Sequence, residues 1–134
     1  MAEPKRKISR IYKDIDLSFT ANALSGDIGK KLDVNAVKQS MKNLLFIHPY
    51  ERKFHPELGS PLNKMLFENM APGNEKILAK LIEQLLTNFE PRVRLVKIDV
   101  KPDYDNNAYS VAINFFVLGI EEPQQLSLNL TRLR

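Results

Sequence analysis

The strongest constraint on the fold is a helix-length apolar stripe that stops at a proline. Between about residues 74 and 89, apolar side chains recur at the three- and four-residue spacing of one helix face: Ile77, Leu78, Leu81, Ile82, Leu85 and Phe89. Pro91 disfavours helical geometry at Glu90, so the helix ends there. Such a helix has to bury its stripe against another layer of the chain.

After Pro91 the apolar period changes from 3.6 to 2, which predicts β-strands. Three sets of alternating apolar residues follow: Val96, Ile98 and Val100, then Tyr109, Val111, Ile113, Phe115 and Val117, then Leu126, Leu128 and Leu130. Polar turns at 102–107 and 119–123 separate them. The pattern predicts a three-stranded antiparallel meander.

The first half of the chain predicts shorter elements. A helix is expected over 34–46 with Asp33 or Asn35 as its N-cap, and a short helix is expected after Ser60 and Pro61. Three prolines and Gly59 make residues 48–61 a surface loop, and residues 22–33 read as a turn or loop. Residues 11–19 alternate as a short strand would.

The expected fold class is α+β, with amphipathic helices packed on a small antiparallel C-terminal sheet. Its 134 residues suit a single domain, with a basic arm at 1–10, a helical part at 34–92 and the meander at 93–134. Five cations in the first thirteen residues suit an acidic protein groove, nucleic acid or solubility. Without interleaved aromatics, solubility or protein docking is favoured.

Composition excludes several classes of protein. The chain has no cysteine, so it has no disulfide framework and no thiolate site. It has no apolar run of membrane-spanning length, and its first residues lack the apolar stretch of a signal peptide, so we expect it to work where it is synthesised.

Candidate catalytic residues are few. Glu57, Glu68 and Glu90 lie in or beside loops, where two of them could serve a glycosidase, but the chain has no tryptophan to line a sugar groove. His48 and His55 match no metal-ligand spacing, and the scattered glycines form no phosphate loop. We therefore expect no catalytic, cofactor or metal site.

Two features suggest binding instead. Glu90, Pro91 and Arg92 join the long helix to the first strand, and a local ion pair there is favoured over a docking corner in which Arg92 clasps a partner carboxylate. The last strand, from about residue 124, is expected at a sheet edge, where it could accept a partner strand. The alternative is that the N-terminal segment covers that edge.

Three short motifs resemble a known family. They are Phe54-His55-Pro56-Glu57-Leu58-Gly59, Leu66-Phe67-Glu68-Asn69 and Glu90-Pro91-Arg92. In this order they resemble the baseplate wedge family of contractile phage tails, also called sheath initiators, which has a relative in type VI secretion baseplates.

The resemblance implies a structural protein of the virion tail baseplate, assembled in the host cytoplasm, without cofactor, membrane or nucleic acid. Glu90, Pro91 and Arg92 would engage the bundle of neighbouring wedge proteins. The C-terminal sheet, similar to the sheath's interlocking domain, would receive strands of the first sheath ring. Tail tube and central hub proteins are further candidate partners. The acceptor residues would be Tyr109, Val111, Ile113, Phe115, Leu126, Leu128 and Leu130.

Two alternatives stand beside this one. The lysozyme label that the family has carried implies a peptidoglycan hydrolase, motivated only by the loop glutamates; the residues give that label no support, and it is disfavoured. A small basic nucleic-acid-binding module would rest on the N-terminal charge.

Overall fold

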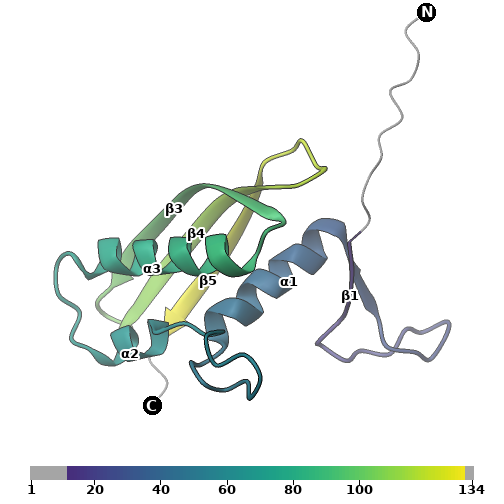
Figure 1. Cartoon of the computed structure of the whole chain (residues 1–134), viewed down its shortest axis with the longest axis horizontal. Helices are drawn as coiled ribbons and strands as arrows, with labels where there is room; N and C mark the ends of the chain where they lie inside the picture. The colour runs from purple at the N-terminus through teal and green to yellow at the C-terminus, as the bar shows by residue number, and fades with distance from the viewer. Residues whose placement is uncertain (1–11, 132–134) are drawn as a thin grey trace, which may run out of the picture.

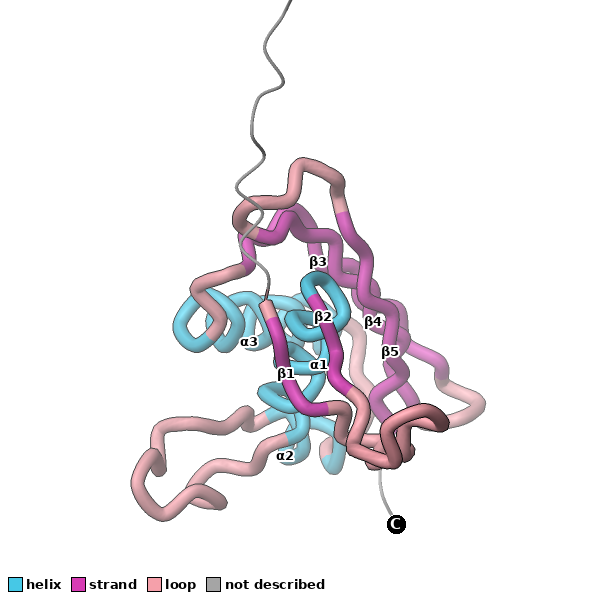
Figure 2. Tube along the Cα trace, turned by 90° about the vertical axis from the view of Figure 1, so that its right-hand side faces the viewer, coloured by secondary structure: helices cyan, strands magenta, loops and turns pink. Residues whose placement is uncertain are grey.

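The fold pairs a three-stranded antiparallel sheet with helices on one of its faces (Figures 1 and 2). The structure, a computed structural model, describes residues 12–131; the basic arm at 1–10 and the last arginines therefore lie outside the described residues. The predicted α+β class is confirmed. The helices are α1 (Asp33–Phe46), α2 (Leu62–Phe67) and α3 (Asn74–Phe89), and the sheet strands are β3 (Val93–Asp103), β4 (Ala108–Val117) and β5 (Gln124–Thr131).

The helix α3 has the predicted bounds, but its buried face is turned slightly from the predicted one. Leu78, Ile82, Leu85 and Leu86 are buried, whereas Ile77 is exposed. These four side chains lie at i, i+4, i+7 and i+8 and face the sheet. Ile77 lies at the margin of the stripe, and the hydrophobic pattern alone assigned it to the core.

The meander has the predicted strands with one irregularity. In β4, Tyr109, Val111, Ile113, Phe115 and Val117 are buried, as their alternation predicts. A register shift between Leu95 and Lys97 marks a bulge in β3, which leaves Val96 exposed while Leu95 and Ile98 both pack on the core. The predicted shared face of Val96, Ile98 and Val100 was therefore wrong, because the extra residue inverts the alternation.

A small hairpin precedes α1. The strands β1 (Lys13–Ile15) and β2 (Lys30–Leu32) pair with each other and lie beyond α1, on the side away from α3 (Figure 1). The predicted strand at 11–19 is thus shorter, its first residue lies outside the described residues, and the expected loop at 22–33 contains β2.

The starts of α1 and α2 differ in whether a side chain hydrogen-bonds the first backbone N–H groups. Neither Asp33 nor Asn35 caps α1 with its side chain; the Asp33 N–H instead donates to the Tyr12 carbonyl at 2.7 Å. Before α2 the Ser60 Oγ accepts from the Leu62 N–H at 3.1 Å, as an N-cap side chain does, but the helix begins at Leu62, so Pro61 takes the N-cap position that was predicted for Ser60. Within residues 12–131, no helix is long and apolar enough to cross a membrane.

Candidate assembly site

The corner between α3 and β3 is fixed by its backbone. The Glu90 N–H donates to the Leu86 carbonyl at 2.9 Å, which closes the last turn of α3. Pro91 cannot continue the helix, and the Val93 N–H donates back to the Glu90 carbonyl at 3.2 Å. The chain therefore reverses from helix to strand within three residues.

The Glu90 carboxylate is buried at this corner. Its side chain is 3% exposed, and it accepts two parallel bonds from Arg92, from Nε at 2.6 Å and from Nη2 at 2.9 Å. The Ser40 Oγ of α1 donates to the same carboxylate at 2.5 Å. One acid thus joins α1 to the start of the sheet, through charge-assisted bonds.

Arg92 extends this network toward two more segments. Its guanidinium lies 5.4 Å from the centre of the Tyr12 ring, a cation–π arrangement. The Tyr12 hydroxyl donates to the Leu118 carbonyl at 3.1 Å, and the Leu118 N–H donates to the Arg92 carbonyl at 2.9 Å. The corner therefore holds the segment before β1, the end of β4 and α1 together.

The electrostatics of the pair agree with this geometry. Burial raises the pKa of Glu90, but the hydrogen bonds from Arg92 and Ser40 and the charge of Arg92 lower it by more, so the pKa falls below its ordinary 4.5. The hydrogen bond to Glu90 raises the pKa of Arg92. Both groups are therefore charged at neutral pH.

The local ion pair expected from the sequence is confirmed. It occupies the guanidinium fork that a clasp on a partner carboxylate would need, while the Arg92 side chain is 31% exposed. Docking at this corner stays a prediction. No sequence pattern indicated Ser40, Tyr12 or Leu118, because these contacts join segments far apart in the chain.

The sheet has strand order β3-β4-β5, which decides between the predicted acceptor strands. The expectation that Tyr109, Val111, Ile113 and Phe115 form an acceptor edge was wrong, because β4 is bonded on both sides. In residues 12–131 no strand pairs with the outer side of β5, so the described part of the N-terminal segment, from Tyr12 onward, does not cover it by strand pairing. Leu126 and Leu130 are buried and Leu128 is partly buried.

The loop before α2 places its motif residues apart. Leu66 is buried, Phe54 is 90% exposed, and Pro56 accepts from the Tyr50 N–H at 3.3 Å. A Cβ on Gly59 would lie 2.6 Å from the Pro49 nitrogen, so only glycine fits there. The remaining motif residues, Phe67, Glu68 and Asn69, are exposed at the end of α2.

This loop meets the corner at a hollow of about 450 Å³. The hollow is lined by Arg52 and Leu58 of the loop, by Ser40 of α1 and by Phe89 at the end of α3. Leu17 of the hairpin also lines it. One residue of the first predicted motif, Leu58, thus lines a surface depression next to Ser40, which donates to the Glu90 carboxylate.

The three candidate acids have different environments, and Glu68 is simply exposed. Glu90 is sealed by Arg92 and Ser40, whereas Glu57 is exposed, lies 3.0 Å from His55 and has a pKa lowered by hydrogen bonds from its own backbone and His55. Residues 12–131 contain no cluster of three metal-ligating His, Asp or Glu side chains.

Comparisons with known proteins agree with the family resemblance. Residues 33–119 match the family model described as baseplate wedge protein gp25. The baseplate wedge protein gp25 of Enterobacteria phage T4 is 31% identical over 124 residues, which is 92% of this chain and 93% of that protein.

Solved structures share the fold at lower identity. A putative tail lysozyme from Geobacter sulfurreducens has a TM-score of 0.66 at 16% identity, covering 73% of this chain and 89% of that one. A chain of the type VI secretion baseplate complex has a TM-score of 0.64 at 17% identity, covering 74% and 93%. A chain of the anti-feeding prophage baseplate has a TM-score of 0.63 at 18% identity, covering 92% and 88%.

The family match covers the helices and the first two sheet strands, and the T4 relative extends the similarity over most of the chain. The chain therefore belongs to the gp25 family of baseplate wedge proteins and is a structural component of a phage or phage-like tail baseplate.

Proposed function

We propose that this wedge protein docks to neighbouring inner baseplate proteins and starts sheath polymerisation by accepting a sheath strand along β5. The observation that carries the proposal is the outer side of β5, which pairs with no strand among residues 12–131, while its pairing with β4 is regular from Gln124 to Thr131. Each backbone hydrogen bond to an added strand contributes about 0.5 to 1.5 kcal/mol. Several such bonds along β5 support stable pairing.

The two edges of the sheet differ in a way that favours β5. The β3 edge carries the bulge at Val96 and also Pro102, which has no N–H to donate. Bulges and prolines are the devices by which proteins protect an edge from strand addition. The β5 strand has neither a bulge nor a proline, so this difference favours strand addition at the β5 edge over the β3 edge.

A matched pair of substitutions tests the acceptor edge. Val100, Val111 and Leu128 lie in one row across the sheet, and the two outer members are both partly buried. An inward lysine at an edge disfavours strand addition. We expect Leu128→Lys, but not Val100→Lys, to prevent sheath assembly on baseplates, as counted by electron microscopy.

Circular dichroism and urea unfolding of both variants serve as the folding control. Normal sheath assembly with a folded Leu128→Lys protein would remove β5 as the acceptor. Equal loss with both folded variants would show that the effect does not belong to one edge.

The hollow beside the Glu90 corner supports the docking part of the proposal. Arg52 is exposed at its rim, while Lys53 is exposed next to it without lining the hollow. We expect Arg52→Glu to weaken wedge assembly and Lys53→Glu to leave it unchanged, measured by native mass spectrometry of wedge complexes. Equal complex formation by both variants would place docking elsewhere.

The proposal includes no catalysis. The Glu90 carboxylate is held by three donors and is not available as a general acid or base. We expect purified protein to release no soluble fragments from peptidoglycan. Release that Glu57→Gln or Glu68→Gln abolishes would establish a hydrolase instead.

A further inference from the structure

A second hollow, of about 360 Å³, connects the hairpin, α1 and the start of β5. Asp16, Ser18 and Lys31 line it from the hairpin side, Lys38 and Lys42 from α1, and Leu126 from β5. Leu126 is the third residue of β5. A chain that pairs along β5 would therefore pass close to this hollow at the level of Leu126.

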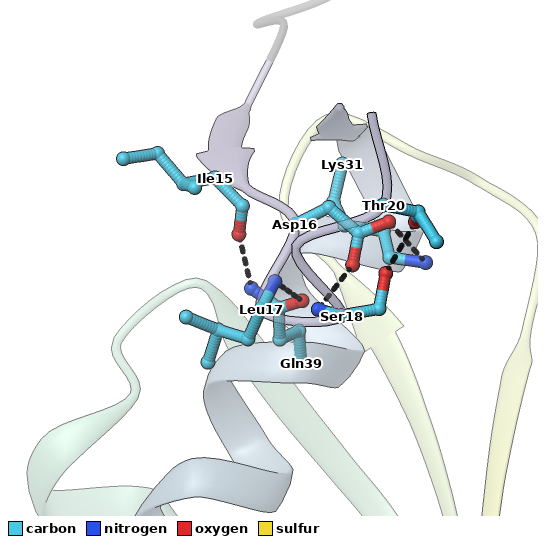
Figure 3. Close-up of polar contacts among 7 residues, drawn as sticks. All are labelled: Ile15, Asp16, Leu17, Ser18, Thr20, Lys31 and Gln39. Atoms are coloured by element: carbon cyan, nitrogen blue, oxygen red, sulfur yellow. Dashed lines mark hydrogen bonds and ion pairs between the residues drawn. The ribbon is translucent and has the colours of Figure 1, made fainter. Parts of the chain in front are cut away.

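The hairpin wall is held in place by one side chain of α1. Gln39 Nε2 donates to the Ile15 carbonyl at 2.7 Å, and the Leu17 N–H donates to Gln39 Oε1 at 3.4 Å (Figure 3). Asp16 accepts from the Ser18 N–H at 3.0 Å. The wall is thus built by specific contacts with α1.

The charges in the hollow do not balance. Lys31 pairs with Asp16 at 3.3 Å, whereas Lys38 and Lys42 form no ion pair with any residue in 12–131. These two lysines are one helical turn apart on the same face of α1, where like charges repel each other. An acidic group placed between them would relieve that repulsion.

We infer that this hollow receives an acidic segment that flanks the sheath strand paired along β5. The inference rests on the proposed function and adds the chemistry of the partner. Lys38 and Lys42 supply the attraction, and Leu126 supplies the connection to the paired strand.

An acidic flanking segment would serve to fix the register, because β5 alone specifies the register of an added partner strand poorly. Leu126, Leu128 and Leu130 repeat every second residue, so a partner strand that slips by two residues meets the same pattern. An ion pair at one end of the strand distinguishes the correct register from its neighbours. The lysines therefore act as positioning residues for strand addition.

A charge-reversal pair with a matched control tests this. Lys38→Glu with Lys42→Glu reverses the hollow, while Lys76→Glu with Lys80→Glu makes the same charge change one turn apart on α3. We expect the first double variant alone to lower the yield of sheathed baseplates roughly fivefold at low salt, with the difference shrinking as salt rises.

Register is read by cross-linking, since the chain has no cysteine of its own. Ser127→Cys on β5 is combined with single cysteines along the sheath strand. We expect one disulfide position with wild-type lysines and additional positions two residues away with Lys38→Glu and Lys42→Glu. Circular dichroism confirms folding of each variant.

The outcomes separate the two proposals. If Leu128→Lys prevents sheath assembly but the Lys38 and Lys42 reversal changes neither yield nor register, the acidic flank is overturned and strand addition stands. If Leu128→Lys has no effect, strand addition fails as well. An equal loss of sheathed baseplates with the α3 double variant would mean that the change in net charge, not the position of Lys38 and Lys42, lowers the yield, and would overturn the acidic flank.

Discussion

At the residue scale, a single buried carboxylate connects distant parts of the chain. Glu90 accepts from Arg92 and from Ser40, and Arg92 lies over the Tyr12 ring. A buried ion pair adds little stability over an apolar pair, but losing one partner leaves the other uncompensated. Removing Arg92 should therefore lower the free energy of unfolding, because the Glu90 carboxylate would remain buried without its cationic partner.

We expect Arg92→Ala to lower the free energy of unfolding by about 3 kcal/mol, because it strands the Glu90 carboxylate in a buried site. Arg94 is the matched control: it is exposed two residues further along β3, and Arg94→Ala should change stability by less than about 0.5 kcal/mol. Urea unfolding followed by circular dichroism gives both values. Similar small losses for the two variants would contradict the role assigned to the corner.

The same pair predicts a pH dependence. Because the pKa of Glu90 is lowered on folding, its charged form stabilises the protein above its ordinary pKa of 4.5, and this stability is lost as the pH falls through the lower folded value. The difference in unfolding free energy between wild type and Glu90→Gln should therefore shrink below pH 4.5. Urea unfolding at several pH values measures it, and a constant difference would exclude the linkage.

At the element scale, regular periodicity was predictable and its interruptions were not. The bounds of α3 and the inward face of β4 follow from spacing alone. The bulge at Val96 does not, since both Leu95 and Val96 are apolar and either could face the core. Packing of α3 on β3 selects Leu95, and that choice depends on tertiary structure.

The candidate site was predictable to the same extent. Glu90, Pro91 and Arg92 were recognisable because proline marks the corner, and the edge position of the last strand follows from the meander order. The hairpin contacts and the partners Ser40 and Tyr12 were not, because non-local hydrogen bonds leave no periodic signal. The central position of β4 also overturned part of the predicted acceptor edge.

The loop before α2 gives a prediction at this scale. We expect Gly59→Ala to destabilise the fold by about 1 to 3 kcal/mol, since its Cβ would lie 2.6 Å from the Pro49 nitrogen and backbone there has to move. Gly29→Ala is the control, because its nearest neighbours are 3.7 Å away. Thermal unfolding and proteolysis of residues 48–61 report the change; equal stability of both variants would argue against the close approach.

At the scale of the whole molecule, the hairpin contributes apolar surface and little burial. Leu24 is 98% exposed and Phe19 is 65% exposed, while Leu78 in α3 is buried. Side chains this exposed bury little apolar area, so they add little hydrophobic stabilisation. The hairpin is therefore a projecting element whose apolar tip adds little to the stability of the isolated chain.

We expect the double variant Phe19→Ser with Leu24→Ser to keep its unfolding free energy within about 0.5 kcal/mol of wild type. Leu78→Ala should lose about 2 to 5 kcal/mol, because it empties a core site. Chemical denaturation compares the two. A large loss in the double variant would mean that the hairpin tip is packed in solution.

The bulge and proline of β3 have a consequence for stoichiometry. Because only the β5 edge is regular, the proposed strand addition would give each molecule one acceptor site. A ring of such molecules would then bind one sheath strand per copy. The first sheath ring would therefore contain as many subunits as the ring of wedge proteins below it.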